Sequence, residues 1–204
     1  MTPTGAVTGP ILEPIPGREV FLRRPEPEDL LNLHYLVTDP RTSLLSGSRG
    51  VPPSKLVHED FHTDSRWDGN LHLAVVERQS GRTVGTATID QIDWPTQTTS
   101  VGIRIIPSLR NRGLATDACM ARDAFLLWRM GLRRLEWRCA ESNAASSRIA
   151  ARLGYALEGR RRAAVYLDGR WEDELLFGLL RSEAEEAPAF AEYRRLVVPR
   201  DDEA

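Results

Sequence analysis

The chain has 204 residues, 41% of them hydrophobic, with a formal net charge of −2 and a sequence pI of about 6.1. These values predict one domain with a substantial core and give no reason to expect DNA or a membrane as a partner. No apolar run approaches the ~20 residues of a membrane helix, and residues 1–17 lack a secretory signal pattern, so we expect a cytoplasmic protein. The two cysteines, Cys119 and Cys139, indicate no disulfide framework.

The first half of the chain predicts a mixture of helices and strands. Residues 1–17 are rich in Pro, Gly and Thr and are expected to form a loose arm. The elements predicted next are a strand over 19–24, helices over 25–39 and 54–64, and strands over 70–77, 83–90 and 98–106. The Ser80-Gly81 pair between two of these strands indicates a hairpin.

The second half predicts strand–helix units and a final hairpin. A helix over 116–130 with Gly131 as its cap, a strand around 135–139, and a helix over 142–153 capped by Gly154 follow one another. Asp168-Gly169 joins strands predicted over 163–167 and 171–180, because this dipeptide favours a two-residue hairpin turn. This order of elements favours an α/β or α+β sheet.

The stretch VGIRIIPSLRNRGLATDA at residues 101–118 carries the strongest functional signal. A strand-like run ends at a proline, a turn bearing arginine and glycine follows, and a helix is predicted to begin near Thr116. The first N–H groups of a helix lack partners within it, and the helix dipole adds to their attraction for anions. Because Arg104, Arg110 and Arg112 surround this turn, we expect a ligand that carries phosphate.

These residues also resemble a known family. The segment RNRGLA at 110–115 resembles the R/Q-x-x-G-x-G/A signature of the GCN5-related N-acetyltransferases (GNAT), whose loop wraps the pyrophosphate of acetyl-CoA. Residues 136–155 resemble the family's second motif, with Asn143 and Ser146 matching its N-x-x-S variant. The E-G-x segment that begins at Glu158 resembles the RimJ/RimL-like branch, and the resemblance covers residues 18–182.

The resemblance implies the fold and the cofactor-binding residues. We expect an α/β (α+β) GNAT fold with a central mixed, mostly antiparallel twisted sheet of six to seven strands, flanked by about four helices and splayed between the third-motif strands. Residues 1–17 would be a flexible arm, 18–182 the N-acyltransferase domain and 183–204 a charged C-terminal tail. The residues expected to contact acetyl-CoA, or another acyl-CoA, are Ile103, Ile105, Arg110, Asn111, Arg112, Gly113, Leu114, Ala115, Thr116, Asn143 and Ser146.

The implied reaction is direct transfer of an acyl group from a thioester to a primary amine. A backbone N–H near residues 103–105, with Ile105 as the candidate, would stabilise the developing oxyanion. Many family members place a tyrosine beside the leaving thiolate, but that position holds Ala150 here, so Ser146 is the candidate hydroxyl.

The general base is not evident from the resemblance. The two positions where the family carries a glutamate base hold Val165 and Ser100 in this chain. Catalysis by positioning alone, with water relaying the proton, is therefore an open alternative. The remaining candidates are Asp90, Asp93, Asp173 and Tyr166, of which Asp173 best matches the branch, with a structural role as its alternative.

The acceptor would be a small-molecule amine or a protein N-terminus, and the protein a monomer or homodimer. The donor could instead be an acyl carrier protein or an aminoacyl-tRNA, docked by arginine patches such as residues 160–162. A non-catalytic acyl-CoA-binding module is a further hypothesis, because carboxylates are missing at both expected base positions.

One segment points to a different chemistry. HEDFH at residues 58–62 matches the H-E-x-x-H pattern of zinc proteases, with Glu59 as the base. The extended pattern fails, because Ser65 and Asp68 occupy the positions that need glycine and the third histidine. We therefore expect no metal and a segment that lines the acceptor pocket, with a zinc hydrolase as the alternative.

Overall fold

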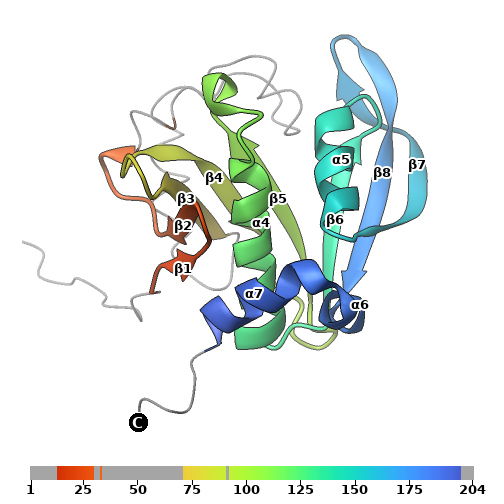
Figure 1. Cartoon of the computed structure of the whole chain (residues 1–204). Coiled ribbons are helices and arrows are strands. Elements are labelled where there is room, and N and C mark those ends of the chain that lie inside the picture. The colour runs from red at the N-terminus through yellow and green to blue at the C-terminus, as the bar shows by residue number, and fades with distance from the viewer. Residues whose placement is uncertain (1–12, 30–32, 34–70, 91, 199–204) are drawn as a thin grey trace, which may run out of the picture.

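The computed structural model describes residues 13–29, 33, 71–90 and 92–198 of the chain. Its centre is an eight-stranded sheet in the order β1-β2-β3-β4-β5-β6-β8-β7 (Figure 1). Neighbouring strands are antiparallel, except that β5 and β6 are parallel. The strands are β1 (Ile15–Pro16), β2 (Val20–Arg23), β3 (Leu71–Glu77), β4 (Thr83–Ile89), β5 (Thr98–Ile105), β6 (Arg134–Ala140), β7 (Ala156–Leu167) and β8 (Arg170–Leu180).

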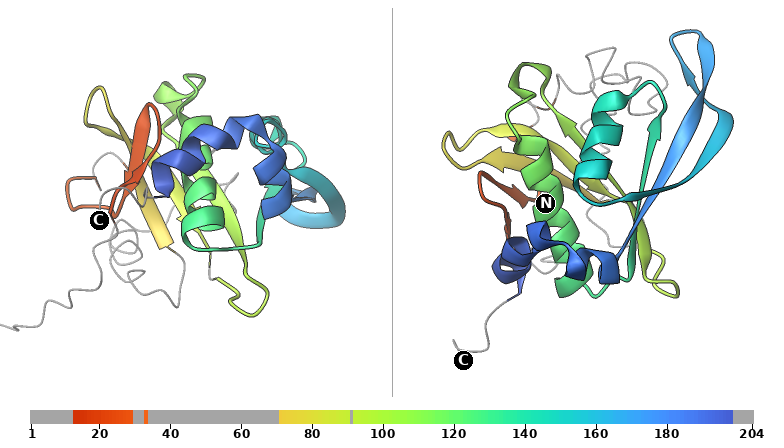
Figure 2. Two further views of the ribbon diagram at one scale, coloured as in Figure 1. Left: turned by 60° about the horizontal axis from the view of Figure 1, so that its bottom comes forward. Right: turned by 45° about the vertical axis from the view of Figure 1, so that its right-hand side comes forward.

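Four α-helices accompany the sheet in the described part of the chain. Helix α4 (Leu114–Ala124) continues into a π-helical turn at Phe125–Arg129, and together they connect β5 to β6. Helix α5 (Ala144–Arg152) connects β6 to β7. Helices α6 (Arg181–Glu186) and α7 (Pro188–Val197) follow β8, and α7 crosses the foot of α4 (Figure 2). None of the described helices has the length and apolar character needed to span a bilayer.

The mixed, mostly antiparallel sheet confirms the predicted fold class, although it has more strands than the expected six to seven. The difference lies in β1, which is formed by two residues of the segment expected to be a loose arm. Ile15 pairs with Leu22 of β2 and is fully buried. Two residues are too few to show a strand periodicity, so the pattern in the sequence did not reveal this strand.

The C-terminal segment corrects the expectation of a charged, partly ordered tail. Phe190, Tyr193 and Val197 of α7 are buried against the core, at a spacing that puts them on one helix face. The Tyr193 hydroxyl donates a hydrogen bond of 2.6 Å to Asp117 of α4. The same carboxylate accepts three backbone N–H groups of residues 18–20, so α4 joins both ends of the domain.

The turn signals of the sequence are confirmed where the structure describes them. Gly131 and Gly154 have positive φ angles after their helices. Asp168 and Gly169 both have positive φ between β7 and β8, as a two-residue hairpin requires. The helix expected from Thr116 begins two residues earlier, at Leu114, because Gly113 adopts a left-handed conformation and acts as its N-cap.

Several expectations lie outside the described residues. Most of the helix expected over 25–39 and all of the helix expected over 54–64 fall there. The HEDFH segment at 58–62 also lies outside them.

The sheet has two halves, β1 to β5 and β6 to β8, which are joined only by a short pairing of β5 with β6. The parallel pairing of β5 with β6 covers Thr98–Ser100 and ends at Ser100 and Glu136, although both strands continue. Beyond that point β5 pairs only with β4, and β6 only with β8. Figure 1 shows the two strands diverging toward the end at which α4 begins. This divergence confirms the predicted splay of the sheet.

A wholly buried ion pair of α4 lies beneath the divergence. The Arg122 guanidinium contacts the Asp123 carboxylate at 2.7 Å and donates to the Gly102 carbonyl of β5 at 2.6 Å. It also lies 5.7 Å from the ring centroid of Trp137 on β6. Asp123 accepts a hydrogen bond of 3.0 Å from the Tyr155 hydroxyl. Arg122 therefore touches both strands just beyond the residues at which their backbones stop pairing.

We expect Asp123→Asn to lower the free energy of unfolding by about 3–5 kcal/mol. The substitution leaves the Arg122 charge buried without its counter-ion, which costs more than the pair itself contributes. Urea unfolding followed by circular dichroism measures the loss. Glu185→Gln is the matched control, because it breaks the exposed Arg181–Glu185 pair and should cost no more than about 0.5 kcal/mol. Equal losses in the two variants would contradict the prediction.

Candidate functional site

The loop between β5 and α4 presents backbone N–H groups. A short 3₁₀ turn at Pro107–Leu109 leads to Asn111 and Gly113, which have φ angles of 62° and 80°. Gly113 is the N-cap of α4 and supplies no side chain to its first turn. A Cβ atom added to Gly113 would meet no atom of the described residues within 4 Å. Within this part of the chain, the first N–H groups of α4 are therefore left uncovered at Gly113, in the arrangement that binds anions at helix N-termini.

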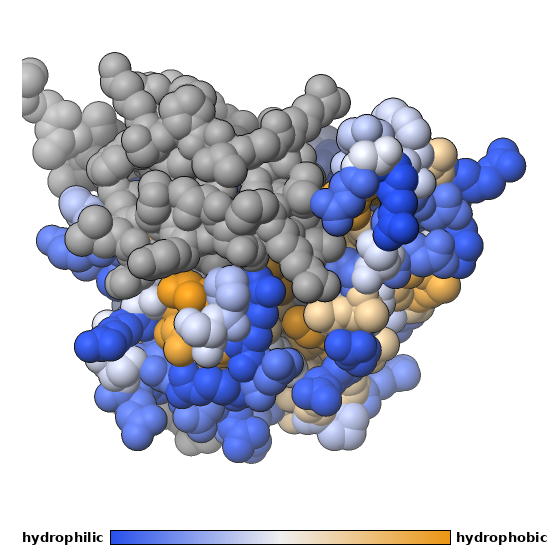
Figure 3. Space-filling model, turned by 90° about the horizontal axis from the view of Figure 1, so that it is seen from above, coloured by the Kyte–Doolittle hydropathy of each residue, from blue (hydrophilic) through white to orange (hydrophobic). Residues whose placement is uncertain are grey.

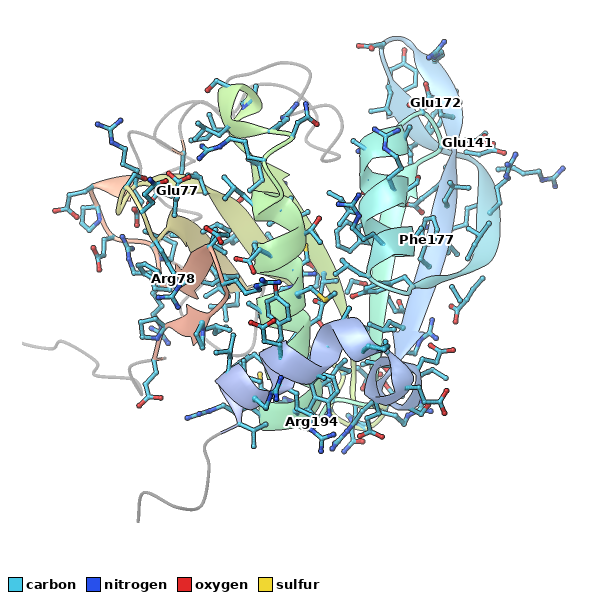
Figure 4. The ribbon with its side chains drawn as sticks, in the orientation of Figure 1. Glu77, Arg78, Glu141, Glu172, Phe177 and Arg194 are labelled. Carbon is cyan, nitrogen blue, oxygen red and sulfur yellow. The ribbon has the colours of Figure 1, made fainter. Side chains whose placement is uncertain are left out.

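Of the three arginines expected to surround the loop, Arg110 and Arg112 lie in it, whereas Arg104 belongs to β5. The Arg110 Nε donates to the Ile105 carbonyl at 3.1 Å, so this side chain braces the loop. Arg112 pairs at 2.5 Å with Glu77, which is labelled at the end of β3 in Figure 4. A hydrogen bond from Ser80, together with Arg112, lowers the pKa of Glu77. The alternation along β5 puts Arg104 on the face away from α4.

Hydrogen bonds at the two ends of β5 define which backbone groups face β4. The Asp90 N–H donates to the Ser100 carbonyl, and the Ile106 N–H donates to the Val84 carbonyl, both at 2.9 Å. Since bonding direction alternates along a strand, even-numbered residues of this stretch bond to β4. The odd-numbered residues point their N–H and C=O groups the other way, toward β6.

Of the three odd-numbered residues of β5 beyond the end of the β5–β6 pairing, the last two are those expected to hold the acyl oxygen. Ile103 and Ile105 follow Ser100, the last residue of β5 that pairs with β6. Their backbone groups therefore face the space between the diverging strands. The Ile105 carbonyl is taken by Arg110. An N–H group directed into this space is suited to stabilise a developing oxyanion, the role expected of these residues.

The N-terminus of α5 faces the same divergence from the β6 side. Asn143 is the N-cap, and its side-chain oxygen accepts the Ser146 N–H at 3.2 Å. The Ser146 hydroxyl oxygen accepts a hydrogen bond of 2.8 Å from the Trp137 indole N–H. The structure therefore brings Asn143 and Ser146 together in the first turn of a helix, where the dipole favours negative charge.

Asp173 and Tyr166 do not belong to this arrangement. The Asp173 carboxylate accepts the Ala163 N–H at 2.9 Å, at a bulge of β7 where Ala163 has a positive φ. It also lies 3.5 Å from Arg160, which pairs with Glu141 near the top of α5 (Figure 4). These contacts give Asp173 a structural role in the hairpin.

Tyr166 is 57% exposed on the β7–β8 hairpin and packs against Trp171, with ring centroids 5.3 Å apart. Its partner is likewise exposed on the hairpin. The structure therefore gives Tyr166 no contact with the loop or with Ser146.

A group of polar side chains lies on the face of the sheet away from α4. The odd-numbered residues of β5 belong to the core, so the even-numbered side chains point to the opposite face. Arg138 of β6 donates to the Ser100 hydroxyl at 2.9 Å on this face. Gly102 lies between Ser100 and Arg104 and has no side chain, and a Cβ there would meet the Thr88 hydroxyl at 2.5 Å. The backbone of β5 is therefore uncovered by its own side chains at this residue.

Asp90 follows β4 and stands opposite Ser100 on this face. Burial raises the pKa of the Asp90 carboxyl, while the charges of Arg138, His72 and Arg122 oppose the rise. Asp90 was one of several candidate bases in the sequence, but nothing in the sequence indicated His72 and Arg138 beside it. Their grouping depends on the register between β3, β4 and β5 and on the short β5–β6 contact.

Neither cysteine is placed for nucleophilic chemistry. Cys119 and Cys139 are both buried, and burial raises the pKa of Cys119 to about 12, so its thiol is not an available nucleophile. Within residues 13–29, 71–90 and 92–198, no three His, Cys, Asp or Glu side chains gather as metal ligands.

Comparison with known proteins identifies the family. The model of the acetyltransferase (GNAT) domain matches residues 19–156. A curated relative, the probable N-acetyltransferase YjcK of Bacillus subtilis (strain 168), is 25% identical over 120 residues. The match covers 58% of this chain and 66% of that relative's length.

Two solved structures share the fold at low sequence identity. The spermidine N-acetyltransferase of Vibrio cholerae in complex with CoA and spermine has a TM-score of 0.76 at 17% identity, covering 82% of this chain and 98% of that one. The ribosomal-protein α-N-acetyltransferase RimL in complex with coenzyme A has a TM-score of 0.74 at 19% identity, with the same coverage of 82% and 98%. Together with the matched domain, these findings show that the chain belongs to the GNAT family of acetyltransferases, with RimJ/RimL-like relatives.

Proposed function

We propose that this protein is an N-acetyltransferase that moves the acetyl group of acetyl-CoA directly to a primary amine. The observation that carries the proposal is the pairing of two features in one place. The N-terminus of α4, where a Cβ on Gly113 would meet no atom of the described residues within 4 Å, lies next to a stretch of β5 beyond the end of its pairing with β6. The first suits a diphosphate, and the second suits the acyl oxygen.

The donor side of the proposal rests on residues 110–116, Asn143 and Ser146. The left-handed conformations of Asn111 and Gly113 turn the loop so that successive N–H groups point outward. Both structural relatives described above were solved with CoA or coenzyme A, which supports the same donor here. When bound, the thioester supplies the activated acyl group, and Ile103 and Ile105 would hold its oxygen.

The acceptor side is the polar face that carries Asp90, Ser100 and Arg138. Asp90 stands beside Ser100, and diagonal neighbours in a sheet lie ~7–8 Å apart, which places Asp90 that far from Gly102. A carboxylate at this distance can reach an amine above the strand. We assign it the role of general base, since neither position of the family's glutamate carries a carboxylate.

Residues on the two faces of the sheet act on different parts of the reaction. Asp90 takes the proton of the acceptor amine as its nitrogen bonds to the acyl carbon. The N–H groups of Ile103 and Ile105 stabilise the negative charge on the acyl oxygen. The carbon–sulfur bond then breaks, its electron pair leaves on sulfur, and the Ser146 hydroxyl donates a hydrogen bond to the thiolate. Relatives that act on spermidine or on a ribosomal protein support two acceptor classes, a small-molecule amine and a protein N-terminus.

A thiol-release assay tests the proposal with acetyl-CoA and a panel of polyamines, aminoglycosides and peptides with free N-termini. Release of CoA that depends on one amine, with a mass increase of one acetyl group on that amine, is the expected result. Tight CoA binding without turnover on any amine would favour a binding module. Turnover only with an acylated carrier protein or an aminoacyl-tRNA would favour the alternative donors.

Gly113→Val should weaken CoA binding at least about tenfold. Valine puts carbon atoms into the open space above the N–H groups and strains a backbone that has φ of 80°. Isothermal titration calorimetry with CoA measures the change.

Gly81→Val is the matched control for this variant. Gly81 has φ of 65° in the β3–β4 turn, and a Cβ there also meets no atom of the residues that the structure describes within 4 Å. It carries the same backbone strain away from the loop, so its CoA affinity should equal that of the wild type. Equal weakening in both variants, or in neither, would refute the loop as the diphosphate site.

Asp90→Asn should lower kcat at least about 100-fold, because the amide cannot accept the proton of the amine. Activity of the wild-type enzyme should decline as the pH falls through the raised pKa of Asp90, since the protonated carboxyl is not a base. Stopped-flow or steady-state rates across a pH series measure both effects. Asp93→Asn is the control, because that carboxylate lies in the β4–β5 connection and accepts from Thr96.

Asp90→Asn should also raise the melting temperature near pH 7. A carboxyl whose pKa is higher in the folded than in the unfolded protein binds more protons when folded, so stability falls as pH rises through that interval. Above it the folded protein holds a charge that burial disfavours, and asparagine removes this charge. Thermal unfolding at pH 7 measures the shift. A lower melting temperature together with lost activity would indicate a structural role.

A further inference from the structure

We propose that Trp137 is a positioning residue for the leaving group: its indole N–H holds the Ser146 oxygen so that the serine O–H points to the departing sulfur. This inference rests on the proposed transfer reaction and on Ser146 as the group that meets the thiolate. It assigns a role to a buried core residue for which the sequence suggested none.

The chemistry of the indole sets the direction of the hydrogen bond. The Trp137 Nε1 atom lies 2.8 Å from the Ser146 Oγ. An indole nitrogen only donates, so the serine oxygen must be the acceptor in this contact. The hydroxyl proton of Ser146 then has to be donated elsewhere. A hydroxyl that accepts one hydrogen bond is also polarised and donates more strongly to a second partner.

The serine is fixed from its backbone side as well. Asn143 accepts the Ser146 N–H, which holds this residue in the first turn of α5. The end of the helix that carries Ser146 is the positive end of its dipole. A thiolate that accepts the Ser146 O–H there would gain from both the hydrogen bond and the dipole.

Packing prevents the Trp137 indole from turning away. The side chain is 2% exposed, and the Tyr155 ring meets it edge-on with centroids 5.8 Å apart. The Arg122 guanidinium lies 5.7 Å from its ring centroid, held in turn by Asp123. Asp123 also accepts from the Tyr155 hydroxyl, so the two neighbours of the indole share one anchor. The buried ion pair is thus linked to Ser146 through a single rigid aromatic ring.

The next serine of α5, Ser147, has no indole N–H beside its hydroxyl and allows a comparison with Ser146. Ser147 lies next to Ser146, and its hydroxyl contacts the Cys139 sulfur of β6 at 3.4 Å. Its hydroxyl also donates to the Asn143 carbonyl at 3.4 Å. The proton of Ser147 therefore has a partner within the helix. This makes Ser147 a natural control for the substitution of Ser146.

The step is balanced without a change in the protonation of serine. The electron pair of the carbon–sulfur bond goes to sulfur, the amine proton goes to Asp90, and Ser146 keeps its proton while donating it in a hydrogen bond. Trp137 touches none of the reacting atoms. Its effect should therefore disappear when Ser146 has no hydroxyl to orient.

The test is a double-mutant cycle with Trp137→Phe and Ser146→Ala, measured by CoA release and by CoA affinity. Trp137→Phe should lower kcat about tenfold, equal to ~1.4 kcal/mol of activation free energy, with the dissociation constant of CoA unchanged within about twofold. The double variant should be no slower than Ser146→Ala, and Ser147→Ala should retain wild-type kcat. Unchanged kcat in Trp137→Phe, or an equal slowing of the Ser146→Ala background, would overturn the proposal.

Two further measurements keep the inference separate from folding and from the proposed function. Benzothienylalanine at position 137 keeps the shape of the indole but lacks the N–H, and it should reproduce the slow kcat of Trp137→Phe. The Trp137 indole proton, one of five in the chain, should exchange with solvent faster in Ser146→Ala than in the wild type. An unchanged exchange rate would refute the contact itself. A wild-type protein that binds CoA but acetylates no amine would instead refute the proposed function.

Discussion

The buried contact between Arg122, Asp123 and the two central strands is the constraint on which the site depends. A sheet that stops pairing in its middle exposes backbone groups and needs support from another element. Arg122 supplies it by bonding to Gly102 on β5 and lying against Trp137 on β6. A charge so deep in the core needs its counter-ion, which Asp123 supplies while accepting a hydrogen bond from Tyr155. The ion pair thus keeps the two halves of the sheet at a fixed separation.

The divergence divides the proposed chemistry between two faces of one sheet. The loop before α4 and the first turn of α5 lie where β5 and β6 separate, on the side that would receive the donor. Asp90, Ser100 and Arg138 lie on the face away from α4, where the acceptor would approach. In the space-filling view onto this end of the molecule, patches of apolar surface lie among hydrophilic residues (Figure 3). One strand, β5, therefore carries the contacts that join the two halves of the proposed reaction.

The termini of the domain reinforce the same helix. Asp117, three residues beyond the start of α4, accepts the backbone of residues 18–20 and the Tyr193 hydroxyl. At the other end of this helix, in the π-helical turn, the Trp128 ring centroid lies 5.6 Å from the guanidinium of Arg194 of α7. Figure 4 labels Arg194 at the foot of the molecule. The segments expected to be a loose arm and a tail thus partly belong to the core, and they fix the orientation of the helix that presents the loop.

The sequence by itself determined the order of most of the described elements, the loop with Gly113 and the hairpin at Asp168-Gly169, because turns and helix starts follow from local residue chemistry. It also placed the chain in its family through motifs that are contiguous. Only the tertiary structure decided which polar residues share a face and which arginines are engaged. It showed that Arg112 is paired with Glu77, that Asp173 supports a bulge and that Trp137 holds Ser146. Those partners are separated by between 9 and 35 positions in the chain, so strand register and helix packing, rather than local pattern, bring them together.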